Sequence, residues 1–335
     1  MPSTGPSSGS GATPLLVAAG CLQRPDGRVL ICRRPGHKIY PGQWEFPGGK
    51  REDGETAVEA LRRELREELG IEVTDCEPLI RLRHDYPELS VLLDVWRVSG
   101  WRGTVRSNEH PESAWVSPGQ LGRWDLLDAN RSIITALRLP KHYVFTPPIA
   151  SLPPLRQHLP ALPRGALLRL RLPGIPDADY ARLAAELEAD CRERGLQLVL
   201  DRDPALSAAL GCGWHASAAT LSGCQHRPIA RGQWFAASCH NARELADARK
   251  LNADFAVLGP VFPTATHAGA VSLGWERFGQ LAIDSGFPVY AIGGVGPEQL
   301  NAARAQGALG VAGISAYWGR SSSAGVGVPS SSGMA

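Results

Sequence analysis

The sequence predicts an α+β domain over residues 14–139, followed by an α/β domain, a (β/α)8 TIM barrel, over residues 140–318. The chain has 335 residues, which is long for a single hydrophobic core. Strand-like runs surround one strong helical pattern in the first half, whereas short apolar strands alternate with helical stretches in the second. Residues 1–13 and 319–335 are rich in Ser, Gly and Pro and are expected to be a disordered leader and tail.

The first domain is predicted to hold short strands around one amphipathic helix. The helix is expected over residues 56–69, because Leu61, Leu65 and Leu69 recur at i, i+4 and i+8 and form an apolar stripe. A weaker helical pattern covers residues 130–139. Apolar runs predict strands at 15–22, 28–34, 89–98 and 113–118.

In the second domain, predicted strands and helices alternate along the chain, as in a parallel sheet covered by helices. Seven prolines between Pro140 and Pro163 predict a linker that leads into it. Helices are expected at 179–194, 242–252 and 297–306. Strands are expected at 143–147, 166–172, 196–201, 213–217, 235–240, 255–262, 288–295 and 310–317. Eight apolar strands that alternate with helices favour a closed (β/α)8 barrel.

The composition argues against several classes of partner. The net charge is only +2, which provides no basic surface for nucleic acid and no attraction to a membrane. The longest apolar run, Leu15–Leu22, is too short to span a bilayer. Seven cysteines without a C-x-x-C pair indicate neither a disulfide framework nor a zinc site. We therefore expect a cytoplasmic protein that binds neither nucleic acid nor membrane.

The predicted helix at 56–69 carries an unusual cluster of negative charge. Glu64, Glu67 and Glu68 stand at i, i+3 and i+4, where like charges share one helix face and repel. One interpretation is a solvated face tempered by the neighbouring arginines. The other is a divalent cation, since Mg²⁺ takes oxygen ligands and neutralises clustered carboxylates.

The spacing around this helix favours the cation. Gly49, Glu55 and the run Arg63-Glu64-Leu65-x-Glu67-Glu68-x-Gly70-Ile71 match the Nudix box at every defined position, and Trp44–Gly48 before it is also typical. The first domain therefore resembles Nudix hydrolases, whose fold is a mixed sheet sandwiched by helices. The resemblance implies cleavage of a diphosphate linkage with Mg²⁺ as cofactor and Mn²⁺ as a substitute.

The resemblance also implies roles for individual residues. Glu55 and Arg63 would pair and preorganise the carboxylates. Either Glu64 or Glu67 would accept the proton of the attacking water, and the sequence does not choose between them. Glu109 would be a further metal ligand on a loop, with Glu112 as the alternative. The implied metal ligands are the Gly48 carbonyl, Glu64, Glu67, Glu68 and Glu109.

Residues outside the box resemble the MutT type of Nudix hydrolase. These are Arg33-Arg34, Glu109 six residues before Trp115, and Asp128-Ala129-Asn130. The implied substrate is a nucleoside triphosphate, 8-oxo-dGTP, which is converted to 8-oxo-dGMP and pyrophosphate in the service of DNA replication fidelity. Asn130 would read the purine edge, with Arg34 and Phe46 helping to hold the nucleotide. Alternatively, Asn130 is a helix N-cap and Arg34 a surface arginine.

The second domain resembles thiamine-phosphate synthases over about 170 residues, as four of its segments match motifs of that family in order. They are Ser238-Cys239-His240, Gly259-Pro260-Val261-Phe262-Pro263-Thr264-x-Thr266, Ile292-Gly293-Gly294-Val295 and Gly310-Val311-Ala312-Gly313-Ile314-Ser315. Barrels commonly bind phosphate at the ends of strands seven and eight, so a small phosphate ligand is implied. The implied phosphate-binding residues are Ser238, Thr264, Thr266, Gly293, Gly294, Ile314 and Ser315.

The second domain departs from the synthase pattern where chemistry is needed. Pro173 and His267 replace two lysines that grip pyrophosphate, and Arg202 replaces the aspartate that binds Mg²⁺. Asp201 or Asp203 could substitute for that aspartate if the register shifts. We expect a barrel without synthase activity. The alternatives are a thiamine-phosphate synthase with an accessory Nudix domain, and a Nudix hydrolase of a thiamine-pathway pyrophosphate.

Overall fold

The structure is a computed structural model that describes residues 13–149, 151–264, 269 and 271–318. The predicted leader apart from Thr13, the predicted tail, and Thr266 lie outside these residues. The chain folds into two compact units: one runs to Leu139 and includes Gly279–Pro288 and Gly307–Leu309, and the other comprises the rest. No helix among the described residues is long and apolar enough to cross a membrane.

The first unit contains a mixed sheet, which confirms the predicted α+β class. A four-stranded sheet has the order β4-β1-β6-β5, in which β1 and β6 are parallel and the other pairs antiparallel. A three-stranded antiparallel sheet has the order β3-β2-β7. The strands are β1 (Leu15–Leu22), β2 (Val29–Arg33), β3 (Trp44–Glu45), β4 (Gly48–Lys50), β5 (Glu72–Asp85), β6 (Ser90–Arg102) and β7 (Ser113–Val116). The helices are α1 (Ala57–Leu69), the 3-10 helix η1 (Pro118–Arg123) and α2 (Asn130–Arg138).

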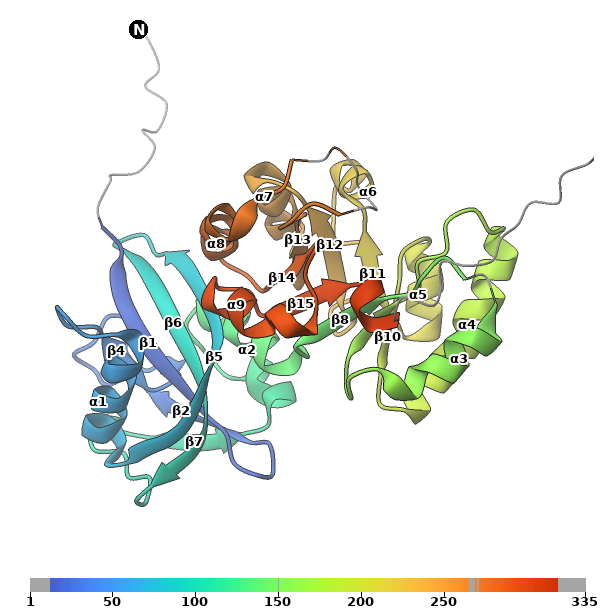
Figure 1. Ribbon diagram of the computed structural model, residues 1–335. Helices are drawn as coiled ribbons and strands as arrows, with labels where there is room; N and C mark the ends of the chain where they lie inside the picture. Colours follow the sequence, from blue (N-terminus) through green and yellow to red (C-terminus); the bar gives the residue numbers. More distant parts are fainter. Residues whose placement is uncertain (1–12, 150, 265–268, 270, 319–335) are drawn as a thin grey trace, which may run out of the picture. The chain divides into compact units, whose positions relative to one another are not determined.

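Helix α1 packs its leucine stripe on the sheet, beside β1 and β4 (Figure 1). Leu61, Leu65 and Leu69 are fully buried in a cluster with side chains of the strands, among them Leu22 and Val98. Burying each leucine contributes roughly 1.5–3 kcal/mol relative to leaving it exposed. The stripe therefore fixes the rotation of the helix, and with it the direction of the carboxylates between the leucines.

The second unit contains the predicted closed barrel of eight parallel strands, in the order β8-β9-β10-β11-β12-β13-β14-β15 and back to β8. The strands are β8 (His142–Phe145), β9 (Leu167–Arg169), β10 (Gln197–Leu200), β11 (Gly213–Ala216), β12 (Phe235–Cys239), β13 (Phe255–Leu258), β14 (Val289–Ile292) and β15 (Gly310–Gly313). The helices along this part of the chain are α3 (Leu152–His158), η2 (Leu159–Ala161), α4 (Asp177–Glu193), α5 (Pro204–Leu210), α6 (Ala218–Gly223), α7 (Ala242–Lys250), α8 (Gly274–Ser285), η4 (Pro297–Gln299), α9 (Leu300–Ala305) and α10 (Ser315–Trp318). Buried aromatic rings of Tyr143, Phe255 and Tyr290 pack against one another at centroid distances of 5.3–5.9 Å.

The stretch between Pro140 and Pro163 contains β8, which confirms the strand predicted at 143–147, and helix α3, which contradicts the predicted linker. This stretch supplies strand β8, which pairs with both β9 and β15 and closes the barrel. It also supplies helix α3, in which Pro153 and Pro154 occupy the first turn. Proline is tolerated there because the first N–H groups of a helix have no partner within the helix. Pro153 and Pro154 therefore mark the start of a helix and not a linker.

Candidate functional site

Helix α1 is capped at both ends by residues of its own segment. Thr56 is the N-cap: its hydroxyl accepts a hydrogen bond from the Glu59 amide, and the Glu59 side chain accepts one from the Thr56 amide. Gly70 ends the helix in the left-handed conformation with φ 67°. Such caps contribute about 1 kcal/mol each. They hold the segment with the three carboxylates as a regular helix.

Two glycines let the backbone of β4 lie directly against these carboxylates. Gly48 has φ 142°, and a Cβ there would overlap the Ala18 carbonyl oxygen of the neighbouring strand β1. A Cβ on Gly49 would overlap the Glu64 carboxylate. The Gly48 N–H donates to Glu68 Oε2 at 2.9 Å. Only glycine is compatible with this approach of strand to helix.

Arg63 organises the charges on one side of the helix. Its guanidinium binds both oxygens of Glu55, at 2.8 and 3.1 Å, and donates to the Lys50 carbonyl at 2.9 Å. Its remaining nitrogen, Nη1, lies 2.9 Å from Glu64 and 3.3 Å from Glu67. The structure thus brings Glu55 and Arg63 together in the pair that the sequence predicts.

The surroundings of Glu55 and Glu64 shift the pKa values of these two carboxyl groups in opposite directions. The hydrogen bond from Arg63, followed by one from the Glu52 amide, lowers the pKa of Glu55 to about 2. Burial raises the pKa of Glu64 above its ordinary value, because it penalises the charged carboxylate more than Arg63 favours it. Glu55 is therefore a fixed anion, whereas Glu64 is a carboxylate with an increased affinity for a proton.

Glu68 lies in a different and more enclosed environment. Its side chain is 2% exposed, and besides the Gly48 amide it faces Lys38 Nζ at 3.4 Å and His110 Nε2 at 3.3 Å. The interaction with Glu68 raises the pKa of His110 above its ordinary value, although burial, the largest single effect, lowers it. The sequence did not single out Lys38 or His110; the position of His110, directly after a candidate metal ligand, was the signal available.

The two candidate carboxylates of the loop, Glu109 and Glu112, lie away from the carboxylates of α1, and their role as metal ligands stays a prediction. Glu109 is exposed and makes no hydrogen bond or ion pair with any residue that the structure describes. Glu112, the alternative, pairs with Arg33 at 2.6 Å. Neither joins Glu64, Glu67 and Glu68. Two other side chains of this loop reach α1: Asn108 donates to the Glu67 carbonyl at 3.0 Å, and His110 faces the Glu68 carboxylate.

The side chains of Glu64, Glu67 and Glu68 and the Gly48 carbonyl have the chemistry of ligands for a divalent cation. In the structure, however, they are not gathered around one point. Carboxylate oxygens and the Gly48 carbonyl are the ligands that hard cations prefer. Within the described part of the chain, however, no three His, Cys, Asp or Glu side chains are gathered closely enough to hold a metal ion. Glu64 and Glu67 turn to Arg63, and Glu68 turns to Lys38 and His110. The donor set of carboxylate and carbonyl oxygens fits Mg²⁺, and the neighbouring Arg63, Lys38 and His110 face the carboxylates.

The candidate nucleotide residues are partly engaged with one another. Arg34 forms an ion pair with Glu45 and donates to the Ile39 carbonyl at 2.8 Å. Phe46 is 4% exposed. Arg34 is therefore not an isolated surface arginine, and the pairing leaves its guanidinium mostly covered, with a side-chain exposure of 15%.

The interpretation of Asn130 as a helix N-cap is wrong. Helix α2 begins at Asn130 itself, its N-cap is Ala129, and no side chain caps it. The Asn130 side chain is buried and donates to the Trp44 carbonyl at 3.4 Å, which is a long hydrogen bond. Its amide therefore faces the strand that precedes Phe46.

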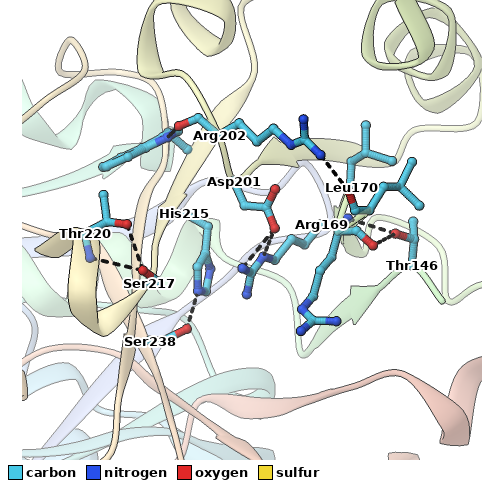
Figure 2. Close-up of polar contacts among 12 residues, drawn as sticks. Thr146, Arg169, Leu170, Asp201, Arg202, His215, Ser217, Thr220 and Ser238 are labelled. Carbon is cyan, nitrogen blue, oxygen red and sulfur yellow. Dashed lines mark hydrogen bonds and ion pairs between the residues drawn. The ribbon is translucent and has the colours of Figure 1, made fainter. Parts of the chain in front are cut away.

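At the carboxyl ends of the barrel strands, polar side chains satisfy one another (Figure 2). Arg169 of β9 binds Asp201 Oδ2 at 3.0 and 3.2 Å, and Asp201 also accepts from the Tyr180 hydroxyl at 3.1 Å. Arg202 donates to the Leu172 carbonyl at 2.8 Å and stacks over the Tyr180 ring at 4.5 Å. Asp203 caps α5. Neither aspartate that could replace the lost Mg²⁺ ligand is free of a partner.

A buried histidine continues this network to the next strands. His215 Nδ1 lies 2.9 Å from the Tyr143 hydroxyl, and Nε2 lies 2.7 Å from Ser238 Oγ. Burial, followed by the charge of Arg169, holds the pKa of His215 well below its ordinary value. His215 is therefore a neutral hydrogen-bonding residue that orients Ser238. Thr220 interacts with Ser217 at the start of α6.

The other candidate phosphate residues lie at strand ends, as the sequence places them. Gly293 and Gly294 follow β14 with φ 90° and 67°, and a Cβ on either would overlap Pro260 or Phe262. Ile314 and Ser315 follow β15, and Ser315 opens α10. Thr264 lies after β13, and Thr266 lies outside the described residues. The residues border one end of the barrel, where their role as phosphate ligands stays a prediction.

Comparison with known proteins divides the chain in the same way. Residues 18–136 match the NUDIX domain family and residues 143–317 the thiamine monophosphate synthase family. A CTP pyrophosphohydrolase of Escherichia coli K12 is 37% identical over 120 residues, which cover 36% of this chain and 88% of the relative. An 8-oxo-dGTP diphosphatase of Proteus vulgaris is 44% identical over 91 residues, which cover 27% and 81%.

A solved thiamine phosphate pyrophosphorylase from Pyrococcus furiosus is 22% identical, with a TM-score of 0.44, and covers 58% of this chain and 90% of that structure. The two family matches fall on the two parts of the chain that hold α1 and the closed barrel. The chain belongs to the Nudix family through residues 18–136 and to the thiamine monophosphate synthase family through residues 143–317.

Proposed function

We propose that the chain is a Mg²⁺-dependent nucleoside triphosphate pyrophosphohydrolase that converts 8-oxo-dGTP to 8-oxo-dGMP and pyrophosphate. The arrangement of α1 carries the proposal: Arg63, fixed by Glu55, faces Glu64 and Glu67 beside the glycines of β4. The 44% identity to an 8-oxo-dGTP diphosphatase supports the choice of substrate. Such a reaction depends chiefly on positioning and on neutralising phosphate charge.

The chain's own groups divide this task. Gly48, Glu64, Glu67 and Glu68 would hold Mg²⁺, which when bound neutralises phosphate charge and makes a bound water more acidic. Arg63 keeps Glu64 and Glu67 in place through its bonds to Glu55. One of these two carboxylates accepts the proton of the attacking water.

The choice of substrate is tested by comparing kcat/KM for 8-oxo-dGTP, dGTP and CTP with Mg²⁺ present. CTP is the second candidate, because the CTP pyrophosphohydrolase of Escherichia coli is 37% identical over most of its own length. We expect 8-oxo-dGTP to have the highest kcat/KM, with pyrophosphate as a product. A higher value for CTP would assign the second candidate instead.

Asn130→Ala is expected to narrow the preference for 8-oxo-dGTP over dGTP by tenfold or more. The buried Asn130 amide has a donor and an acceptor, which alanine lacks. A lost hydrogen bond of this kind is worth roughly 1–3 kcal/mol. The measurement is the ratio of the two kcat/KM values in the wild type and the variant.

Thr135→Ala is the matched control, since Thr135 lies on the same helix and its hydroxyl donates to the Arg131 carbonyl within that helix. It is expected to leave the ratio unchanged. If N130A lowers both kcat/KM values equally, Asn130 merely supports Trp44, and the oxidised-purine proposal loses its base-reading residue.

We also propose that the barrel binds a small phosphate ligand without synthase activity. Asp201 is bound to Arg169 and Tyr180, and Arg202 occupies the position at which the synthase pattern has its Mg²⁺ ligand. A guanidinium repels the cation that such a reaction requires. The full-length chain is therefore expected to form no thiamine phosphate from the pyrimidine pyrophosphate and thiazole phosphate with Mg²⁺. Robust formation of thiamine phosphate would refute this part of the proposal.

A further inference from the structure

The two oxygens of Glu68 have different partners. Oε2 accepts a hydrogen bond from the Gly48 amide at 2.9 Å and lies 3.3 Å from His110 Nε2. Oε1 faces Lys38 Nζ at 3.4 Å. The Lys38 side chain is 29% exposed, whereas the His110 side chain is fully buried. One oxygen is therefore held by rigid groups, and the other by a flexible side chain that water reaches.

The His110 ring is fixed from both sides. Its Nδ1 lies 3.3 Å from the Arg33 carbonyl of β2, and its Nε2 faces the Glu68 carboxylate. Both neighbours are oxygen atoms that the ring meets from opposite sides, so the ring has little freedom to turn. The contact to Glu68 is a close approach of 3.3 Å and not an aligned hydrogen bond, because Nε2 has no hydrogen-bond partner among the described residues.

We propose that His110 is a positioning residue, which holds Glu68 Oε2 against the Gly48 amide and thereby presents Oε1 to a divalent cation. This inference rests on the proposed function, since it assigns a partner to one of the proposed metal ligands. Groups that orient metal-binding carboxylates are typically worth a factor of 10–100 in metal affinity. Lys38 then occupies Oε1 only until the cation replaces it.

The sign of the effect separates positioning from simple electrostatics. Removing a positive charge near a cation site raises the affinity for the cation, because a repulsion disappears. If His110 acted only through its charge, its removal would therefore strengthen metal binding. A loss of affinity on removing His110, larger than the loss caused by destabilising the helix, therefore indicates a carboxylate that is no longer held in place.

The test is direct binding of Mn²⁺ to the full-length chain without nucleotide, followed by electron paramagnetic resonance. His110→Leu removes the contact to Glu68, and His110→Asn keeps a polar side chain that is too short to reach it. Both are expected to weaken Mn²⁺ binding by about 10–100-fold. His110→Gln, whose amide nitrogen can approach the position of Nε2, is expected to recover part of the loss. If H110L does not fold, the Mn²⁺ affinity of H110N decides whether the inference holds.

Two further variants are controls. Thr56→Ala removes the N-cap of the same helix, far along it from Glu68, and lowers its stability without changing the carboxylate. Lys38→Met removes the cation at Oε1 and is expected to leave Mn²⁺ affinity unchanged or raise it. Unchanged or stronger binding in H110N, or an equal loss in T56A, would overturn the inference while the proposed function stands. Failure of the wild type to bind Mn²⁺ would overturn both.

Discussion

Replacing Glu67 by glutamine is expected to lower kcat/KM for the nucleoside triphosphate by about a hundred- to several-thousand-fold. The substitution removes one charge from the carboxylate cluster, a change worth roughly 3–5 kcal/mol of transition-state stabilisation. The Glu67 side chain is 52% exposed and contacts Arg63 Nη1 at 3.3 Å, so its replacement leaves the core of the unit intact. Steady-state kinetics with Mg²⁺ measures the loss, and an unchanged melting temperature shows that the fold persists.

Glu59→Gln is the matched control, because it makes the same change of charge on the same helix. Glutamine can still accept the hydrogen bond of the capping box from the Thr56 amide. This variant is expected to retain the activity of the wild type. If E67Q also stays within threefold of the wild type, Glu67 has no part in the metal site.

Among the substitutions considered, Arg169→Met, in the second unit, is expected to lower the free energy of unfolding most. Arg169 and Asp201 have side-chain exposures of 9% and 12%, and breaking such a buried pair leaves one charge without its partner. The expected loss is about 3–5 kcal/mol. For a unit of 150–250 residues this lowers Tm by about 6–20 °C. Thermal unfolding followed by far-ultraviolet circular dichroism measures the shift.

A second substitution tests the cause of that loss. Asp201→Asn in the R169M background removes the unpaired charge and is expected to recover at least half of the shift in Tm. Arg182→Met breaks an exposed pair with Asp179, which is worth less than about 1 kcal/mol, and serves as the control. A shift in R169M no larger than in R182M would mean that the Arg169–Asp201 pair does not stabilise the barrel.

The sequence predicts regular apolar strands well and irregular ones poorly. The apolar run at 15–22 coincides with strand β1, because an unbroken series of buried side chains leaves one pairing register. Strand β5 was not predicted, although it is 14 residues long. Its pairing with β6 shifts register near Asp75 and Pro78, so the alternation of apolar and polar residues is broken.

The candidate site divides in a similar way. The spacing of Glu64, Glu67 and Glu68 is local and can be recognised along one helix. Lys38 and His110 approach Glu68 from 30 residues before it and 42 residues after it, and no periodicity connects them. Which distant residues approach Glu68 depends on how the strands pair and on the paths of the loops. Neither can be read from the residue types at these positions. Polar side chains buried by tertiary packing are thus the part that the sequence alone leaves open.

The most direct test of the proposed function follows pyrophosphate release from 8-oxo-dGTP by the full-length chain, with Mg²⁺ and then with excess chelator. We predict release of 8-oxo-dGMP and pyrophosphate that requires Mg²⁺ and is lost in E67Q. Hydrolysis that continues in chelator, or that E67Q retains in full, would contradict the assignment of this helix as the catalytic centre.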